Sequence, residues 1–390
     1  MSGKGRETSG QKQQKNSKRG GWLLWLTAAV TLLLGWALLA LPGTVSKGIL
    51  SGLRACGGVI IPSLFPFMVL SGFVTLSPVG ELLSRPLTLI TTKMLRLPRQ
   101  LGGVVLMSFI GGYPVGARAI SNLLRQGRIS PQTAARMMVS CVNPGPSFVI
   151  GAVGLLVLGS PQAGAAVFAA QAVSALLLGW LFARRAKDEP PPALQTADYP
   201  PLPVAFVEAV RGAAMAMVVI CGFVLLFSAV IALLNADGML GRLSGWVSAA
   251  TLGLIPADAF SCALAGMLEV TYGTLLCGVL PPQTARLLVP FLLAFGSVSV
   301  ICQVAACFDG QKINLRPFVL SRFLHGLLTA VIAQPLLGLV PKTASVFLPG
   351  DRPLPYTTPA TMPATLLLVA MASMLLLSCA DKKGSRSASK

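Results

Sequence analysis

The sequence predicts an all-α polytopic membrane protein with about eight transmembrane helices and two re-entrant hairpins in an inverted repeat. Hydrophobic residues make up 54% of the 390 residues and charged residues only 11%, and several apolar runs are long enough to cross a bilayer. Prolines and glycines interrupt some of these runs, and the two halves of the chain share short motifs. Together these observations predict a fold of the kind found in secondary transporters.

The charged residues indicate a membrane surface rather than nucleic acid. The formal net charge is +19, but Lys and Arg gather in short loops and tails beside apolar runs, as the positive-inside rule describes. Residues 1–21 carry six basic residues among Gly, Ser and Gln, with no apolar content to fold around. We therefore expect a disordered basic cytoplasmic tail that rests on anionic lipid, and no nucleic-acid partner.

The cysteines do not indicate a metal or redox site. All eight lie inside apolar runs, no Cys-x-x-Cys pair occurs, and His325 is the one histidine. Metal sites usually need closely spaced thiol and imidazole ligands. We expect the cysteines to be small packing residues, with no metal site and no cofactor beyond a coupling proton or sodium ion.

The first elements are a basic tail, a crossing and a first repeat. Residues 22–41 form a first transmembrane helix that runs from the cytoplasm outwards. Repeat 1 covers 45–184, and its first crossing, 49–74, contains Pro62 and Pro66 and should bend there. Basic residues between 85 and 99 mark the cytoplasmic end of that crossing and an interfacial helix.

The next segment is too short to cross. A bilayer needs about 20 apolar residues, whereas the apolar run stops near 115 and the following arm carries Arg118, Arg125 and Arg128. We therefore predict a re-entrant hairpin from the cytoplasmic side with its tip at 111–116. Residues 131–158, broken at 143–146, then cross outwards, and 163–182 return to a Pro-rich cytoplasmic linker at 185–204.

Repeat 2, at 205–340, carries short copies of first-half motifs. Pro-Gln-Thr-Ala at 131–134 recurs at 282–285, and Pro98 corresponds to Pro256. Each repeat has an odd number of crossings and one hairpin, so the two should insert with opposite orientation, the second hairpin (257–280) from outside. An outer loop at 341–361, a last transmembrane helix at 362–380 and a basic tail at 381–390 leave both termini in the cytoplasm.

The helix breaks predict the substrate site. Backbone groups freed by proline or glycine at membrane depth need a protein-walled, partly wet cavity, and transporters bind solutes at such breaks. The repeat sets the 111–116 tip opposite 269–273 and the 143–147 break opposite 294–298. The alternative is that these breaks are kinks packed against neighbouring helices. The candidate substrate-binding residues are Gly111, Gly112, Tyr113, Pro114, Gly116, Arg118, Asn143, Ser147, Thr271, Ser297, Ser299 and Gln303.

Two charges stand out because a charge inside a membrane is costly and tends to mark function. Glu269, between apolar residues of the second hairpin, is either a coupling site for a proton or cation or a carboxylate paired with a neighbouring helix. Arg118 presents a planar fork that suits a carboxylate, and otherwise it holds lipid phosphate. Tyr113 either stacks on an aromatic solute or fills the hairpin tip. We expect His325 to be a packing or interhelical hydrogen-bond residue.

With these motifs the chain resembles the YlbJ-type sporulation integral membrane proteins. The resemblance is carried by Phe-Ile-Gly-Gly-Tyr-Pro-Val-Gly-Ala at 109–117, Gly-Arg-Ile-Ser at 127–130, Cys-Val-Asn-Pro-Gly-Pro-Ser at 141–147 and Gly-Met-Leu-Glu-Val-Thr-Tyr-Gly at 266–273. More broadly it looks like the nucleoside-recognition "Gate" domain, related to concentrative nucleoside transporters, over roughly residues 45–340. The family implies movement of dipicolinic acid from the mother cell towards the forespore. The first tip lacks the glutamate of the nucleoside transporters.

The leading expectation is a secondary transporter that exports a small aromatic dicarboxylate, bound as an anionic small-molecule substrate. A nucleoside or nucleobase transporter of the same fold and a non-transporting scaffold for spore-envelope assembly are the alternatives. We expect no enzyme, because no nucleotide loop, paired catalytic carboxylates or nucleophile with a nearby base occurs in the sequence. The expected location is the mother-cell or forespore-surrounding membrane, and a homo-oligomer is left open.

Overall fold

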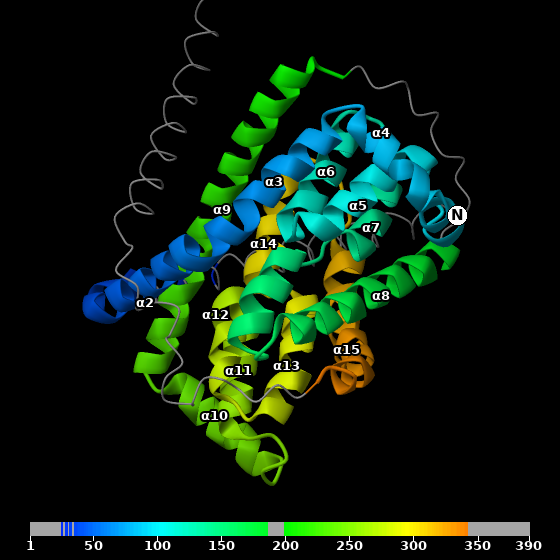
Figure 1. Ribbon diagram of the computed structural model, residues 1–390. Helices are drawn as coiled ribbons and strands as arrows, with labels where there is room; N and C mark the ends of the chain where they lie inside the picture. The colour runs from blue at the N-terminus through cyan, green and yellow to red at the C-terminus, as the bar shows by residue number, and fades with distance from the viewer. Residues whose placement is uncertain (1–24, 26–27, 30, 33–34, 186–198, 342–390) are drawn as a thin grey trace, which may run out of the picture.

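The computed structural model describes residues 25, 28–29, 31–32, 35–185 and 199–341 (Figure 1). Within these residues the regular structure is helical and contains no strand, which confirms the predicted all-α class. The two basic tails, part of the first predicted crossing, most of the Pro-rich linker, nearly all of the outer loop and the last predicted crossing lie outside the described residues.

Among the described residues, five helical segments are long and apolar enough to cross a membrane. They are Pro42–Thr75, Pro161–Arg185, Leu202–Ala236, Pro282–Cys307 and Arg316–Gly338. These confirm a multi-pass membrane protein. Of the eight predicted crossings, the one at 131–158 is divided by its break into two shorter pieces. Of the other two, the crossing at 22–41 is described only in part, and the one at 362–380 lies wholly outside the described residues.

The first half begins with one long helix. α2 (Pro42–Ala55) passes through a π-helical turn (Cys56–Ile60) into α3 (Ile61–Thr75). The π-turn directly precedes Pro62, whose ring cannot donate to the preceding turn, and a π-bulge accommodates that lost bond. The elements that follow are α4 (Val79–Ser84), short helical turns at Arg85–Leu87, Ile90–Met94 and Arg99–Leu101, α5 (Gly102–Ile110), α6 (Tyr113–Arg125), α7 (Pro131–Ser140), a π-helix (Ser147–Gly154) and α8 (Pro161–Arg185).

The second half has the same order of elements. A long helix is followed by a shorter one, a hairpin, a broken helix and a second long helix. These elements are α9 (Leu202–Ala236), α10 (Met239–Ala250), α11 (Ala257–Leu268), α12 (Val270–Leu276), a 3-10 turn (Cys277–Val279), α13 (Pro282–Phe295), α14 (Val298–Cys307) and α15 (Arg316–Gly338).

The matched prolines occupy equivalent places in the two halves. Pro98 and Pro256 are both extended, with ψ of 140° and 142°, directly before the first helical turn of a hairpin. Pro131 and Pro282 each form the first residue of the helix after the hairpin, α7 and α13. Proline suits both positions because it has no N–H to leave unpaired there.

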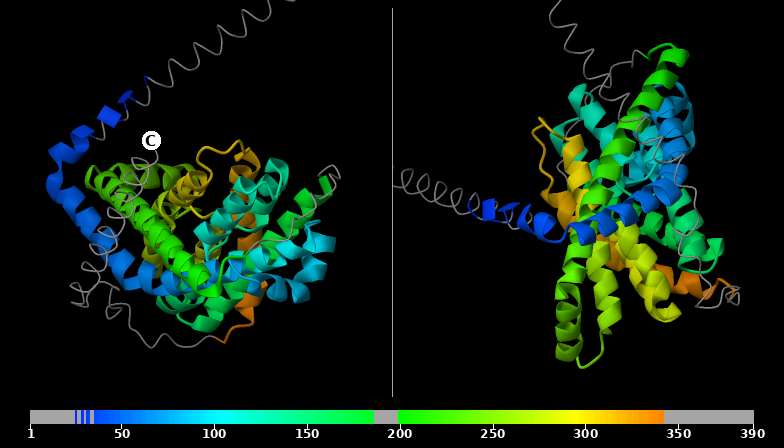
Figure 2. Two further views of the ribbon diagram at one scale, coloured as in Figure 1. Left: turned by 90° about the horizontal axis from the view of Figure 1, so that it is seen from above. Right: turned by 90° about the vertical axis from the view of Figure 1, so that its left-hand side faces the viewer.

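The first helix of each half packs against the other in antiparallel fashion. A Cβ added at Gly48 would lie 2.7 Å from the Cβ of Ala232, and one added at Gly72 would lie 3.2 Å from that of Ala209. Residue numbers therefore rise along α2–α3 as they fall along α9, and Figure 2 shows the two elements crossing. Small residues at these points let the backbones approach closely. Antiparallel packing of equivalent helices supports an inverted repeat, while its orientation in a membrane stays a prediction.

Candidate functional site

The first hairpin turns at two glycines. α5 ends at Ile110 and α6 begins at Tyr113, so the tip is Gly111–Gly112 and the predicted 113–116 segment forms the first turn of α6. Gly112 has φ of +85°, a conformation that favours glycine. Pro114 falls in the first turn of α6, where its missing N–H costs nothing.

The second hairpin turns at Glu269. α11 ends at Leu268, Glu269 is extended (φ −141°, ψ 116°), and α12 begins at Val270. The Glu269 Oε2 atom accepts a hydrogen bond of 2.6 Å from the backbone N–H of Tyr272, so the carboxylate caps α12. Glu269 is only 1% exposed. Within the described residues no basic side chain forms an ion pair with it.

The break after α7 is held open by a buried arginine from α15. Arg322 is 0% exposed, and its Nη1 and Nη2 atoms donate 2.7 Å hydrogen bonds to the carbonyls of Val142 and Val139. Its guanidinium also lies 4.9 Å above the centre of the Phe318 ring. Arg322 therefore satisfies carbonyls that the end of α7 would otherwise leave unpaired at membrane depth, and it opposes the negative end of that helix.

Two amides complete the break. Gln171 of α8 donates from Nε2 to the carbonyl of Pro144 (3.0 Å), and Asn143 donates from Nδ2 to the carbonyl of Ser140 (2.6 Å). Nε2 of His325 on α15 lies 3.1 Å from the carbonyl of Gln171, which supports the expected interhelical role. These bonds make the break a fixed part of the fold rather than a frayed helix end.

The fourth break divides α13 from α14. Gly296 and Ser297 have φ of +92° and +89°, and the Ser297 hydroxyl caps α14 by accepting from the N–H of Val300 (3.3 Å). The hydroxyl of Tyr113 donates to the carbonyl of Leu293, one turn before this break. The first hairpin tip is thus tied to the broken helix of the other half.

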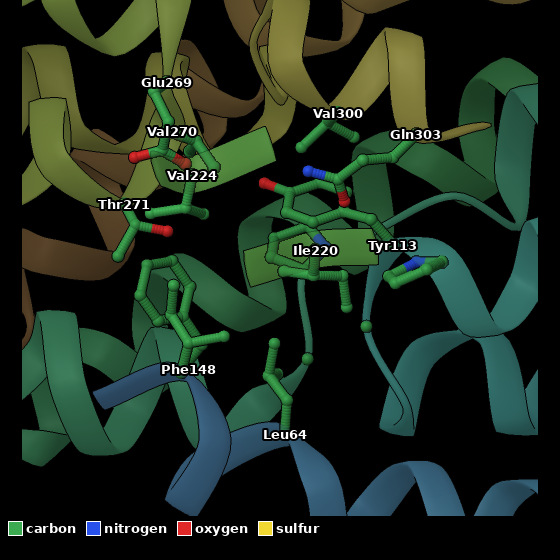
Figure 3. A pocket seen from close by; sticks show the side chains of 15 residues that line it. Leu64, Tyr113, Phe148, Ile220, Val224, Glu269, Val270, Thr271, Val300 and Gln303 are labelled. Atoms are coloured by element: carbon green, nitrogen blue, oxygen red, sulfur yellow. The ribbon is translucent and has the colours of Figure 1, made fainter. Parts of the chain in front are cut away.

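A small cavity lies where the breaks meet (Figure 3). Its volume of about 40 Å³ is room for a few water molecules. Glu269, Val270 and Thr271 lie on one side of it, Tyr113 and Gln303 on the other, and Phe148 and Leu64 lie beneath. The lining residues are Ile60, Leu64, Gly112, Tyr113, Pro114, Pro144, Gly145, Phe148, Ile220, Val224, Glu269, Val270, Thr271, Val300 and Gln303.

The candidate residues from the sequence divide into three groups. Those that line the central cavity are Gly112, Tyr113, Pro114, Glu269, Thr271 and Gln303. Those that hold the breaks from behind the cavity wall are Gly111, Gly116, Asn143, Ser147, Ser297 and Ser299. Arg118 alone of the candidates lines a different, second cavity, between α3, α6 and α9.

The residues behind the wall have packing and bonding roles. A Cβ on Gly116 would lie 1.7 Å from the carbonyl oxygen of Cys141, so the hairpin presses directly on the first break. The Ser147 hydroxyl donates to the carbonyl of Ser63 (2.6 Å), and the Ser299 hydroxyl accepts from Gln303 (3.1 Å).

Sequence reasoning missed Arg322 and Gln171 as site residues. The signal for Arg322 was present, because it is a basic residue inside the apolar run that forms α15. Gln171 gave a weaker signal as a single amide in α8. The apolar lining of Leu64, Phe148 and Ile220 could not be told from ordinary core positions.

The fold and site define a multi-pass, all-α membrane protein with a small cavity, lined by apolar and a few polar side chains, at the meeting point of four helix breaks. The chain is similar to the sporulation integral membrane protein YlbJ of Bacillus subtilis (strain 168), with 28% identity over 339 residues, 79% of this chain and 81% of that protein. This confirms the predicted resemblance to the YlbJ-type family. No protein-family profile matches the chain. No solved structure matches it either, and the wider resemblance to the Gate domain stays a prediction.

Proposed function

We propose that this chain is a secondary transporter with a role in sporulation, which moves dipicolinic acid out of the mother cell across its membrane towards the forespore. The proposal includes no catalytic activity. The sporulation role rests on the similarity to YlbJ, a sporulation integral membrane protein. The transport role rests on the central cavity. Both halves of the chain contribute a hairpin tip or broken helix to its wall, as in transporters that bind solute between repeats.

The electrostatics of the cavity favour a carboxylate. The first turns of α6 and α14 contribute Tyr113 and Val300 to its wall, so two helix N-termini lie beside the solute space. Helix N-termini carry partial positive charge and stabilise anions. Arg322 adds a full positive charge at the carbonyls of Val142 and Val139, where it offsets the negative end of α7. The Tyr113 ring supplies an apolar face on which an aromatic acid can stack.

Glu269 is the proposed coupling group. A carboxylate beside an anionic substrate is repulsive, whereas a protonated carboxyl is not, so binding of a dicarboxylate should be linked to proton uptake at Glu269. Glu269 lies at the hairpin tip and in the cavity wall, so its carboxyl group and a substrate carboxylate would share one cavity. A change in protonation there alters the cap of α12, which links the proton to the conformation of the hairpin.

The central cavity is small in this structure. Space for a few waters is too small for an aromatic ring with two carboxyl groups. Substrate binding therefore requires one or both hairpins to move, and antiparallel repeats give the chain two similar ways to do so.

The test is transport by purified protein in liposomes. Radiolabelled dipicolinate should accumulate when a proton gradient is imposed and should not do so in liposomes with the Glu269→Gln variant. Uridine in place of dipicolinate tests the nucleoside alternative. If neither solute moves under a proton or a sodium gradient, the result would favour the non-transporting scaffold.

A further inference from the structure

The second cavity is the larger of the two. It has a volume of about 280 Å³, against about 40 Å³ at the centre, and lies between α3, α6 and α9. Its lining residues are Met68, Ser71, Gly72, Thr75, Leu76, Val115, Arg118, Ala119, Asn122, Pro200, Glu208, Ala209, Gly212 and Ala213. It has room for a small organic molecule, which the central cavity lacks.

Arg118 is the positive charge inside this cavity. Its Nη1 donates to the carbonyl of Gly212, and its Nη2 would lie 3.5 Å from a Cβ added at that glycine. A guanidinium has further N–H donors for a carboxylate. The carboxylate in the lining, Glu208, pairs with Arg211 at 3.4 Å, and both are half-exposed or more. The acidic charge is therefore balanced at the rim.

The two cavities are lined by neighbouring stretches of the same two helices, α9 and α3. On α9, Glu208 to Ala213 line the second cavity, and Ile220 and Val224 line the central one. On α3 the same division falls between Leu64 and Met68. Seven residues of helix separate Ala213 from Ile220, a rise of roughly 10 Å.

An apolar constriction lies between the two cavity linings. Met68, Val115 and Met217 belong to one packed cluster with Leu64, Ile220 and Val224. Met217 is fully buried and lies one turn from each cavity lining on α9. Methionine side chains are flexible and can re-pack to open a passage.

From this arrangement we infer that the second cavity is an outer anion site, where Arg118 binds a carboxylate of the substrate before it passes the Met68–Val115–Met217 constriction to the central cavity. The inference rests on the proposed transport function for its substrate. The site itself is defined by charge and geometry, so it can be tested with other anions.

The first experiment measures charge selectivity in the second cavity. Ala213→Cys, which lines it, is modified in the full-length protein by methanethiosulfonate reagents with anionic or cationic head groups, and the parent chain gives the background. Arg118 should favour the anionic reagent, and Arg118→Ala should reduce the anionic-to-cationic rate ratio by about tenfold. Arg118→Lys, which keeps the charge, should retain the ratio. Arg242→Ala is the control, because this surface arginine of α10 pairs with Asp237 at the far end of α9.

The outcomes separate the two proposals. A ratio that Arg118→Ala leaves unchanged, in protein shown to be folded by size-exclusion chromatography, overturns the outer anion site even where dipicolinate is transported. A second outcome is a rate ratio that depends on Arg118 and a modification rate that falls when benzoate is added, but no transport of dipicolinate. This outcome supports the site and rejects the proposed substrate. If added dipicolinate slows the modification of Ala213→Cys, and does not slow it when Arg118→Ala is also present, both proposals are supported.

The second experiment tests the constriction. Val224→Cys reports on the central cavity. Met217→Ala should raise the modification rate of that cysteine by about tenfold or more, because a fully buried side chain of the constriction is removed. Met138→Ala, at another fully buried methionine, is the matched control and should leave that rate unchanged. Equal rates in the Met217 and Met138 variants would contradict the proposed route.

Discussion

The hydroxyls of Ser174 on α8 and Thr329 on α15 lie 2.5 Å apart in a buried hydrogen bond. These residues are 155 positions apart, close to the separations of about 151 to 158 between the repeated motifs. Gln171 and His325, 154 positions apart, are also in contact. Residues related by a two-fold axis meet each other only where they lie on that axis. The two contacts are those expected if the axis of the predicted inverted repeat passes between α8 and α15, beside the break that Arg322 holds.

Removal of one hydroxyl of the Ser174–Thr329 pair should cost more stability than removal of both, because a single buried hydroxyl is left without a partner. Ser174→Ala leaves the Thr329 hydroxyl without its partner and should lower the free energy of unfolding by about 1–3 kcal/mol. The double variant Ser174→Ala, Thr329→Val removes both polar groups and should recover part of that loss. Thermal unfolding in detergent measures each variant. A double variant as unstable as the sum of the single ones would mean that the hydroxyls do not interact.

Arg322 should be required for the fold of the first break. Arg322→Met removes two charge-assisted hydrogen bonds to buried carbonyls and should destabilise the protein by about 3 kcal/mol or more. Arg322→Lys keeps the charge and part of the bonding, so its loss should be smaller. Arg316→Met, at the exposed start of α15, is the control. If the unfolding midpoints of the Arg322 variants equal that of this control, Arg322 does not stabilise the end of α7.

The glycines of the first hairpin should differ in their response to substitution. A Cβ at Gly116 collides with the Cys141 carbonyl, whereas one at Gly112 meets nothing closer than 3.5 Å. Gly116→Ala should therefore greatly reduce the yield of folded protein. Gly112→Ala should fold with a strain of about 1–2 kcal/mol from its positive φ. Gly151→Ala, with no atom within 4 Å of the new Cβ, should match the parent. The readout is the monodisperse fraction after detergent extraction, and equal yields for all three would refute the close packing.

These glycines show how far the sequence alone could go. Proline and glycine in apolar runs predicted the two breaks of the first half, because such residues disrupt helices wherever the chain folds. The internal repeat then predicted their two counterparts in the second half. These patterns could not show that Gly116 packs behind the wall while Gly112 lines the cavity. That difference depends on which segment lies opposite in the fold.

The position of Arg118 was beyond sequence reasoning for a similar reason. Its place just after the first tip suggested that it meets Glu269 at one site. However, the tip is at Gly111–Gly112, so Arg118 lies in the second turn of α6 and lines the second cavity instead. Arg322, more than 200 residues along the chain, supplies the charge nearest the break at Val142.

The inverted repeat predicts opposite faces for the two hairpin bases. Gln126, at the end of α6, should face the cytoplasm, and Leu252, before α11 and 93% exposed, should face outside. Figure 1 places α4 and the α10–α11 turn at opposite ends of the molecule. An impermeant maleimide applied to intact cells should label Leu252→Cys and not Gln126→Cys. Labelling of both from one side would contradict opposed insertion.

The most direct test of the account is the proton dependence of dipicolinate transport at Glu269. Purified protein in liposomes should accumulate radiolabelled dipicolinate under an imposed pH gradient. Glu269→Gln keeps the acceptor oxygen that caps α12 but cannot bind a proton. This variant should therefore lose accumulation while still exchanging labelled for unlabelled dipicolinate across the membrane. Accumulation by Glu269→Gln with the same pH dependence as the parent would contradict the coupling role, and no dipicolinate movement by the parent would contradict the proposed substrate.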